Sequence, residues 1–251
     1  MKTASNYKAN LEIVSDLENL AHRSVGVFVE DAKKAIESRG NFFVAISGGH
    51  TPIRFFELLG QSPEVKALPW DKIHLFWVDE RYVPLDSQWS NYRLASGTFL
   101  PEVDIPQKNI HRIPTEHSDI KYAAECYESI IREIFGLAED QIPEFDLIVL
   151  GMGEDGHVGS LFTDSYAHFD TTDLACVVYV LDEKLNRITL THPVLCAGSH
   201  LVVLVSGENK SGILKEVLSS ELDEVRYPVH FLWPVLDKVT WLVDAEAARL
   251  L

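Results

Sequence analysis

The stretch FFVAISGGHTP (42–52) joins an apolar, β-rich run to a glycine turn and to the start of a helix. Continuous apolar residues over 42–46 are typical of a strand that is buried on both faces of a sheet. Gly48 and Gly49 then permit a tight turn. Thr51, with proline directly after it, predicts a helix whose N-cap is Thr51. The segment therefore predicts a strand–turn–helix unit, the building block of an α/β fold.

Apolar runs of strand length recur along the rest of the chain. They cover residues 73–78, 145–150, 177–181, 188–191, 201–205 and 239–243. Segments with helical spacing alternate with several of these runs. This alternation predicts an open, mostly parallel sheet with helices on both faces, a Rossmann-like three-layer α/β fold. Since no linker or repeat interrupts the pattern, we expect residues 1–251 to form a single domain.

Capping residues mark the ends of several predicted helices. Ser15 and Glu18 have capping-box spacing, and Gly40 ends the helix that they open. Ser90 or Asn91 is suited to cap a second helix. We expect the last strand to be followed by a helical tail.

The charge balance of the chain is strongly acidic. Twenty-two Lys and Arg residues stand against 38 Asp and Glu residues, which gives a formal net charge of −16. Nucleic acid and anionic membranes bind basic surfaces, so we expect neither as a partner. A small anionic ligand needs only a local cluster of cations and stays compatible with this charge.

Cysteine usage and the N-terminal residues indicate the compartment. Cys126, Cys176 and Cys196 lie far apart and form no CxxC pair, so neither a zinc knuckle nor a disulfide framework is predicted. The first 20 residues lack the apolar run of a signal peptide, and no apolar run approaches the ~18 residues of a membrane span. We expect a cytoplasmic protein.

Residues suited to binding an anion follow two of the predicted strands. In open α/β sheets, ligands bind outside the carboxyl ends of the strands. The Gly48-Gly49 turn and the helix after it offer free N–H groups to a phosphate or carboxylate, although the turn is equally explained as a tight connection. Asp79, Glu80 and Arg81 come directly after another strand. Arg81 is suited to grip an oxyanion, and a solvated strand end with an ion pair is the alternative.

GMGEDGH (151–157) follows the strand FDLIVL and admits two interpretations. It matches the G-x-G-x-x-G fingerprint of dinucleotide-binding proteins, so a nicotinamide dehydrogenase is one alternative, but that fingerprint normally opens the nucleotide fold. Alternatively, His157 with Asp155 nearby is a candidate general base, or it has a structural role. No nucleophile elbow, phosphate-binding loop or metal-ligand spacing occurs, so we expect neither a metal nor another cofactor.

Two more cations belong to the candidate site. Arg187 begins a predicted strand, and Lys210 follows the strand 201–205 at its carboxyl side. Each alone is more often a surface cation. Together with Arg81 and the Gly48-Gly49 turn, they predict one phosphate pocket.

These segments, in this order, resemble the 6-phosphogluconolactonase family. The resemblance rests on AISGGHTP (45–52), WVDERYVP (77–84), SNYRLA (90–95), FDLIVLGMGEDGHVGSLF (145–162), RITLT (187–191) and VSGENK (205–210). It extends over essentially the whole chain. It implies a metal-free hydrolase of the oxidative pentose phosphate pathway that opens 6-phospho-D-glucono-1,5-lactone to 6-phosphogluconate.

Glucosamine-6-phosphate deaminases share the superfamily and are the main alternative. They typically carry the sequence D-E-Y where this chain has Asp79-Glu80-Arg81, and F-N-E-P after the histidine turn. Here those positions read Ser160-Leu161-Phe162-Thr163, without an acid. Both differences favour the lactonase. A non-catalytic sugar-phosphate sensor is a further alternative.

The resemblance and the residues together give a mechanistic hypothesis. His157, oriented by Asp155 or by Asp79 across the cleft, takes a proton from the water that attacks the lactone carbonyl. Arg81, Arg187, Lys210 and the turn at Gly48, Gly49 and Thr51 bind the phosphate and the sugar hydroxyls. The expected partner is a small-molecule sugar-phosphate lactone, and the expected state is a monomer or weak homodimer.

Overall fold

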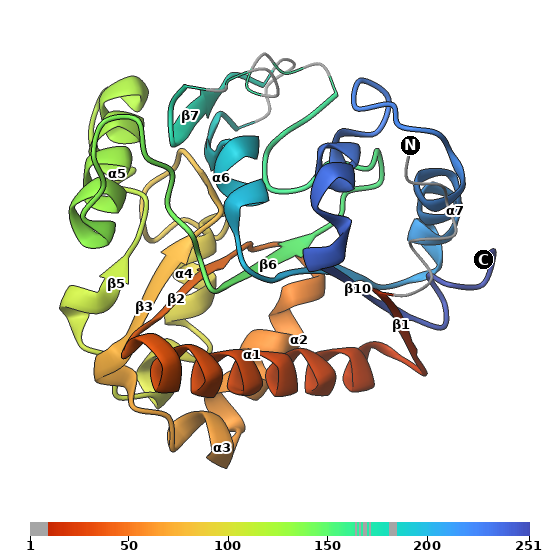
Figure 1. Cartoon of the computed structure of the whole chain (residues 1–251), viewed down its shortest axis with the longest axis horizontal. Helices are drawn as coiled ribbons and strands as arrows, with labels where there is room; N and C mark the ends of the chain where they lie inside the picture. The colour runs from red at the N-terminus through yellow and green to blue at the C-terminus, as the bar shows by residue number, and fades with distance from the viewer. Residues whose placement is uncertain (1–9, 164, 166, 168–169, 171, 181–184) are drawn as a thin grey trace.

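Seven parallel strands of the described residues form the central sheet, in the order β1-β10-β9-β6-β2-β3-β5 (Figure 1). The computed structural model describes residues 10–163, 165, 167, 170, 172–180 and 185–251. The predicted α/β class with a mostly parallel sheet is confirmed. The strands are β1 (Leu11–Val14), β2 (Phe42–Ile46), β3 (Ile73–Trp77), β5 (Ile110–His111), β6 (Leu147–Gly151), β9 (Leu201–Val205) and β10 (Val239–Asp244).

Helices cover both faces of this sheet. Figure 1 shows α1 and α2 on one face and α5 and α6 on the other. The α-helices are α1 (Leu17–Arg39), α2 (Thr51–Gln61), α3 (Pro63–Lys66), α4 (Asn91–Ser96), α5 (Ile120–Phe135), α6 (His192–Ala197) and α7 (Ser211–Ser219). Short 3₁₀ segments are η2 (Trp70–Lys72), η3 (Leu100–Glu102), η4 (Gln107–Asn109) and η6 (Glu208–Lys210). The longer 3₁₀ stretch η7 (Pro228–Lys238) is interrupted by a kink at Val235.

A second, antiparallel sheet stands beside the carboxyl ends of the main strands. It has the order β4-β8-β7, from β4 (Asp79–Arg81), β8 (Arg187–Leu190) and β7 (Ala175–Val178). The strand predicted at 177–181 therefore begins two residues earlier, and Leu181 lies outside the described residues. An apolar run indicates a buried strand without indicating its partner, so the sequence pattern does not separate this sheet from the first one.

The ends of α1 correct one capping prediction and confirm another. The N-cap is Asp16, whose carboxylate accepts the Asn19 N–H at 2.8 Å, and not Ser15. A carboxylate is the stronger acceptor at the positive end of a helix. Gly40 ends the helix in the left-handed conformation (φ 84°), as predicted.

Two further end predictions are wrong. His50, not Thr51, occupies the N-cap of α2, and its side chain makes no capping hydrogen bond. Thr51 is the first residue of the helix, which places the proline at the second position. Residues 245–250 after β10 form turns in place of the expected helical tail.

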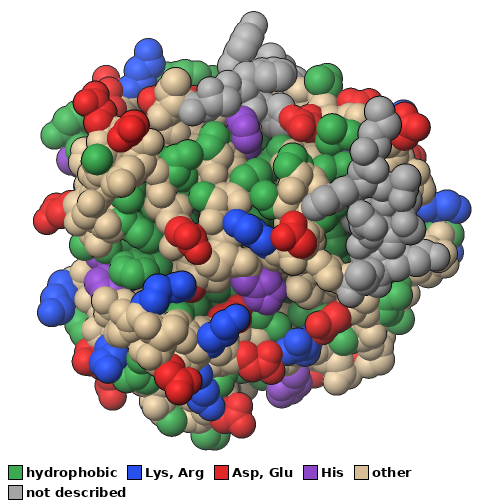
Figure 2. Space-filling model, viewed as in Figure 1, with side chains coloured by type: hydrophobic (Ala, Val, Ile, Leu, Met, Phe, Trp, Pro, Cys, Tyr) green, Lys and Arg blue, Asp and Glu red, His purple; other side chains and the backbone are tan. Residues whose placement is uncertain are grey.

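Charged side chains of both signs are interspersed over the face seen in Figure 2, where Asp, Glu, Lys and Arg alternate around apolar and polar surface. No large basic patch occupies this face. None of the described helices has the length and apolar character needed to cross a membrane.

The order of strands creates a natural ligand position between β2 and β6. These two strands pair with each other, but the next strand of the sheet after β2 is β3, on one side, and the next after β6 is β9, on the other, reached by way of the second sheet. At such a switch the loops leave in opposite directions and open a crevice at the carboxyl ends of the strands.

Candidate active site

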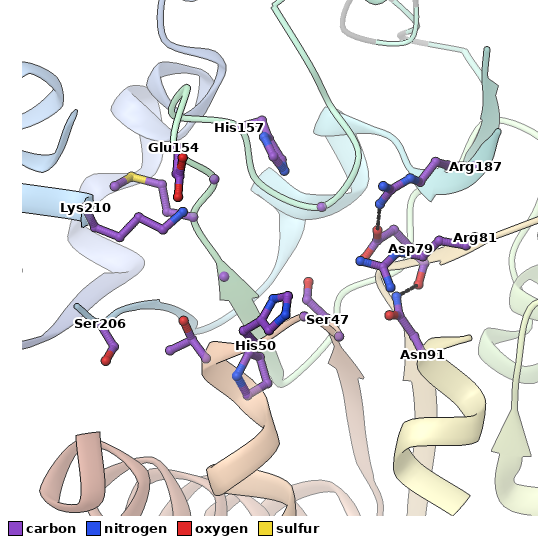
Figure 3. Close-up of a pocket in the computed structure, with 18 of the residues that line it drawn as sticks. Ser47, His50, Asp79, Arg81, Asn91, Glu154, His157, Arg187, Ser206 and Lys210 are labelled. Atoms are coloured by element: carbon purple, nitrogen blue, oxygen red, sulfur yellow. Dashed lines mark hydrogen bonds and ion pairs between the residues drawn. The ribbon is translucent and has the colours of Figure 1, made fainter. Parts of the chain in front are cut away.

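A cavity of about 320 Å³ lies at this switch point (Figure 3). Its walls come from the turns that follow β2, β6 and β9 and from β4 and β8. Of the nine residues that the sequence predicts for the site, eight line it: Gly48, Gly49, Thr51, Asp79, Arg81, His157, Arg187 and Lys210. The ninth, Asp155, contacts His157. Residues from five separate segments are thus brought together.

His157 and Asp155 form a hydrogen-bonded pair at the end of β6. The His157 Nδ1 lies 2.5 Å from Asp155 Oδ1, which also accepts the His157 backbone N–H at 3.2 Å. Burial would raise the pKa of the Asp155 carboxyl, but the hydrogen bond and charge of His157 lower it to about 2. The ionised carboxylate keeps Nδ1 protonated, which leaves Nε2 as the nitrogen able to accept a proton.

Gly153 makes room for the imidazole of His157. A Cβ on residue 153 would lie 2.2 Å from both Nδ1 and Cε1 of the ring. On the other side, the Phe162 ring lies 4.5 Å from the imidazole, centroid to centroid. Gly153 is therefore needed because it lets the His157 ring fit. In a dinucleotide-binding fingerprint, the glycine would instead let a pyrophosphate approach the backbone.

The Asp79 side chain contacts Ser160 and Arg187, not His157. Its Oδ2 accepts the Ser160 hydroxyl at 2.7 Å and lies 3.9 Å from Nη1 of Arg187. Of the two carboxylates predicted to orient His157, Asp155 is therefore the one that contacts it. Asp79, only 4% exposed, instead offsets part of the Arg187 charge.

Arg187 and Arg81 lie opposite each other on β8 and β4. Burial lowers the pKa of the Arg187 guanidinium, and the Asp79 carboxylate opposes that shift. The Arg187 guanidinium also lies 5.6 Å from the centre of the Phe162 ring. Arg81 donates to the Trp89 carbonyl at 2.8 Å. Two guanidinium groups on neighbouring strands favour an anion between them.

Glu80, between these charges, has a structural role that the sequence pattern does not reveal. Its buried carboxylate accepts the N–H groups of Arg81, Asn91 and Tyr92 and the Ser90 hydroxyl, at 2.7–3.0 Å. Burial raises its pKa, and these hydrogen bonds oppose the shift. Glu80 thereby fixes the start of α4 to β4 and holds Arg81 in place.

Asn91 was not predicted as a site residue, although it belongs to the SNYRLA segment. It is 2% exposed, lines the cavity and donates from Nδ2 to the Asp79 carbonyl at 2.8 Å. A Cβ on residue 48 would lie 1.9 Å from its Oδ1. Gly48 is therefore required for the β2 turn to meet α4 closely.

The start of α2 is open to a ligand. Gly49 has φ 104°, no side chain caps the helix, and its first turn carries no acid. The backbone N–H groups of this turn and the positive end of the helix favour an anion.

Two polar residues at the opposite wall were also missed. Glu154 and Asn209 line the cavity, and Asn209 Nδ2 donates to Glu154 Oε1 at 2.6 Å. They connect the turn after β6 to the turn after β9, next to Lys210. Sequence spacing gives no signal for this contact because 55 residues separate the two partners.

The segment after His157 does not open a helix. The chain folds back through the bridges Met152–Val158 and Val158–Leu161, so GMGEDGH lacks the helix N-terminus that a dinucleotide fingerprint requires. In the described part of the chain, no group of three or more His, Cys, Asp or Glu side chains is arranged to hold a metal ion.

Comparison with known proteins agrees with this architecture. The family model of glucosamine-6-phosphate isomerases/6-phosphogluconolactonase matches residues 15–241. The 6-phosphogluconolactonase of Nostoc sp. is 37% identical over 240 residues, 96% of this chain and 97% of the relative. That of Synechocystis sp. is 37% identical over 239 residues, 95% and 97% of the two chains.

Solved structures extend the comparison to three dimensions. The 6-phosphogluconolactonase of Thermotoga maritima superimposes with a TM-score of 0.78 at 30% identity, over 93% of this chain and 98% of the other. A monomeric glucosamine-6-phosphate deaminase reaches a TM-score of 0.80 at 17% identity, over 96% and 100%, a likeness of fold alone. The chain belongs to the glucosamine-6-phosphate isomerase/6-phosphogluconolactonase family.

Proposed function

We propose that the protein hydrolyses 6-phospho-D-glucono-1,5-lactone to 6-phospho-D-gluconate, a step of the oxidative pentose phosphate pathway. Relatives named 6-phosphogluconolactonase that align over almost their whole length support this assignment. The observation that carries it is the His157–Asp155 pair in one cavity with Arg81, Arg187 and Lys210. A base and a cluster of cations are what hydrolysis of a phosphorylated lactone needs.

In the proposed reaction, His157 Nε2 accepts a proton from water as the water oxygen bonds to the lactone carbonyl carbon. The bond between that carbon and the ring oxygen then breaks, and the imidazolium returns the proton to the departing oxygen. The new carboxylic acid loses its proton to solvent. Positioned general-base catalysis contributes about 10² to 10⁴-fold, enough for a δ-lactone, which already hydrolyses unaided.

The remaining groups bind and orient the substrate in this scheme. Arg81, Arg187 and Lys210 bind the phosphate and sugar hydroxyls together with the turn at Gly48, Gly49 and Thr51. Asp155 is a positioning residue that fixes the tautomer of His157. Asp79 acts one step further from the reacting atoms, since it contacts Ser160 and Arg187.

A deaminase activity is the alternative that shares this family. The described residues Ser160–Thr163 provide no carboxylate beside His157, and Asp79-Glu80 is followed by Arg81. We therefore favour the lactonase.

The three free thiols at Cys126, Cys176 and Cys196 are compatible with a reducing cytoplasm, where we propose that the protein acts. We also propose that it acts on a small molecule as a monomer or weak homodimer.

Proton release from freshly prepared 6-phosphogluconolactone tests the proposal. We expect release well above the uncatalysed rate, and no ammonia from glucosamine 6-phosphate. Ammonia release would instead identify a deaminase. Tight binding of 6-phosphogluconate without acceleration of lactone opening would identify a sensor.

A further inference from the structure

Glu154 places an exposed negative charge in a cavity that gathers three cations. The other carboxylate that lines it, Asp79, is buried beside Arg187. Glu154 lies in the turn after β6, is exposed, and lines the cavity with Lys210 on the opposite turn. Asn209 holds its carboxylate through the 2.6 Å hydrogen bond to Oε1. An acid at the mouth of an anion-binding cavity weakens anion binding, so its presence there calls for a physical reason.

Glu154 lies in the same turn as His157, the candidate base. Glu154 and His157 project from one tight turn, closed by the hydrogen bond from Gly153 N–H to the His157 carbonyl at 2.8 Å. Figure 3 shows both side chains pointing into the cavity, with Lys210 on the Glu154 side. Burial lowers the pKa of the Lys210 amine, and the carboxylates of Glu154 and Asp155 oppose that shift.

Hydrolysis changes the charge of the ligand at one end only. The lactone carries a neutral ester at C1, and the product carries a carboxylate there. The phosphate at the other end is the same in both. If His157 activates water at C1, the carboxylate forms beside the turn that also carries Glu154.

We propose that Glu154 discriminates between substrate and product by repelling the C1 carboxylate of 6-phosphogluconate, so that the product leaves and is not rebound. The inference rests on the proposed function, because it takes C1 to lie beside His157. A like charge near an ionised group is unfavourable, whereas it has little effect on a neutral ester. Asn209 is the positioning residue that keeps the Glu154 carboxylate at the wall.

A binding experiment on two ligands separates this role from simple competition for Lys210. The ligands are 6-phospho-D-gluconate and D-glucitol 6-phosphate, which has the same carbon chain and phosphate but an uncharged CH₂OH at C1. Calorimetric dissociation constants are measured for the unmodified protein and for Glu154→Gln. We expect Glu154→Gln to bind 6-phosphogluconate about two- to fivefold more tightly, the size of an exposed charge interaction, and to bind glucitol 6-phosphate unchanged.

The control is Glu208→Gln. It removes the same charge close to Lys210, but Glu208 pairs with Arg249 and does not line the cavity. It should change neither constant. Equal tightening of both ligands by Glu154→Gln would assign Glu154 to competition with the phosphate and overturn the proposal, as would no change for 6-phosphogluconate.

Neither measurement depends on turnover, so the two proposals fail separately. A protein that does not open the lactone contradicts the lactonase assignment, while the ratio of the two dissociation constants still decides the role of Glu154. In a protein that does turn over, product inhibition by 6-phosphogluconate should strengthen in Glu154→Gln by the same factor as binding. The difference between the two proteins should shrink at about 0.5 M salt, because the interaction is between exposed charges.

Discussion

A substitution of His157 should separate catalysis from substrate binding. In His157→Ala the cations that bind the substrate remain, but no side chain is left to take the proton from water. We expect kcat to fall by about two orders of magnitude or more while KM changes little. Proton release, corrected for spontaneous opening, measures both constants. His22→Ala, an exposed histidine on α1, is the control, and near-normal turnover by His157→Ala would remove it from the mechanism.

Asp155 should assist His157 without titrating in the working range. Its pKa is lowered to about 2 in the folded protein, below the ordinary value of about 4. Because the pKa is lower in the folded state, the ionised carboxylate stabilises the fold at pH values above the pKa of the unfolded state. This contribution is lost as pH falls through about 2. Above pH ~5 the carboxylate is ionised, so the acid limb of the kcat/KM profile belongs to another group. Asp155→Asn should lower kcat about tenfold or more and retain that limb; its disappearance would assign the limb to Asp155.

Arg187 should act on the phosphate and not on the lactone ring. Arg187→Ala removes a half-buried guanidinium, and a hydrogen bond to a charged group contributes ~1.5–3 kcal/mol. We expect KM for the phosphorylated lactone to rise about tenfold or more with little change in kcat. Arg81→Ala should act in the same direction. Unphosphorylated glucono-1,5-lactone is the comparison substrate, and an equal loss on both substrates would argue against phosphate binding by Arg187.

The residues of the site were largely predictable because their types are unusual where they stand. A histidine, glycines and charged residues directly after apolar strands have no packing reason to be there. The same argument failed for Glu80, which is 1% exposed and binds backbone N–H groups of α4. It also gave no sign of Asn91, and it marked the turn that carries Glu154 without giving Glu154 a role. Their roles depend on partners that are distant in the sequence, and no local pattern encodes those contacts.

At the scale of elements, the turn after β6 is shaped around one imidazole. Gly153→Ala would place a Cβ 2.2 Å from the His157 ring, and the ring must move. Because misplacement of a catalytic group by about 1 Å costs about 10²-fold, we expect kcat to fall at least tenfold while the melting temperature changes little. Gly212→Ala in α7, where a Cβ meets nothing within 4 Å, is the control. Unchanged kcat in Gly153→Ala would mean that the ring tolerates another position.

Elements differ in how far the sequence predicts them. β2 and β9 occupy the predicted residues, because each is a continuous apolar run between clear turn signals. The sheet of β4, β8 and β7 was not predicted. Asp79–Arg81 are too polar for a buried strand on local grounds, and they pair with β8 more than 100 residues later. Long-range pairing overrides local composition here, and it creates the wall that carries both arginines.

At the scale of the whole molecule, a net charge of −16 is compatible with an anionic substrate because the cations of the site lie together. The three site cations come from β4, β8 and the turn after β9, and the fold brings them to one cavity. On the face in Figure 2, acidic and basic side chains are interspersed. The positive potential is therefore local, inside a field that repels anions at long range.

Salt should act on these two fields at different concentrations. The Debye length is about 30 Å at 0.01 M and about 8 Å at 0.15 M, so long-range repulsion is screened first. The contacts inside the cavity are much shorter and weaken only at higher salt. We expect kcat/KM for the phosphorylated lactone to rise between about 0.01 and 0.15 M NaCl and to fall above about 0.5 M, and to stay nearly flat for glucono-1,5-lactone. A steady fall from the lowest salt would mean that the positive potential of the cavity extends beyond its mouth and outweighs the net charge at the distances where substrate is captured.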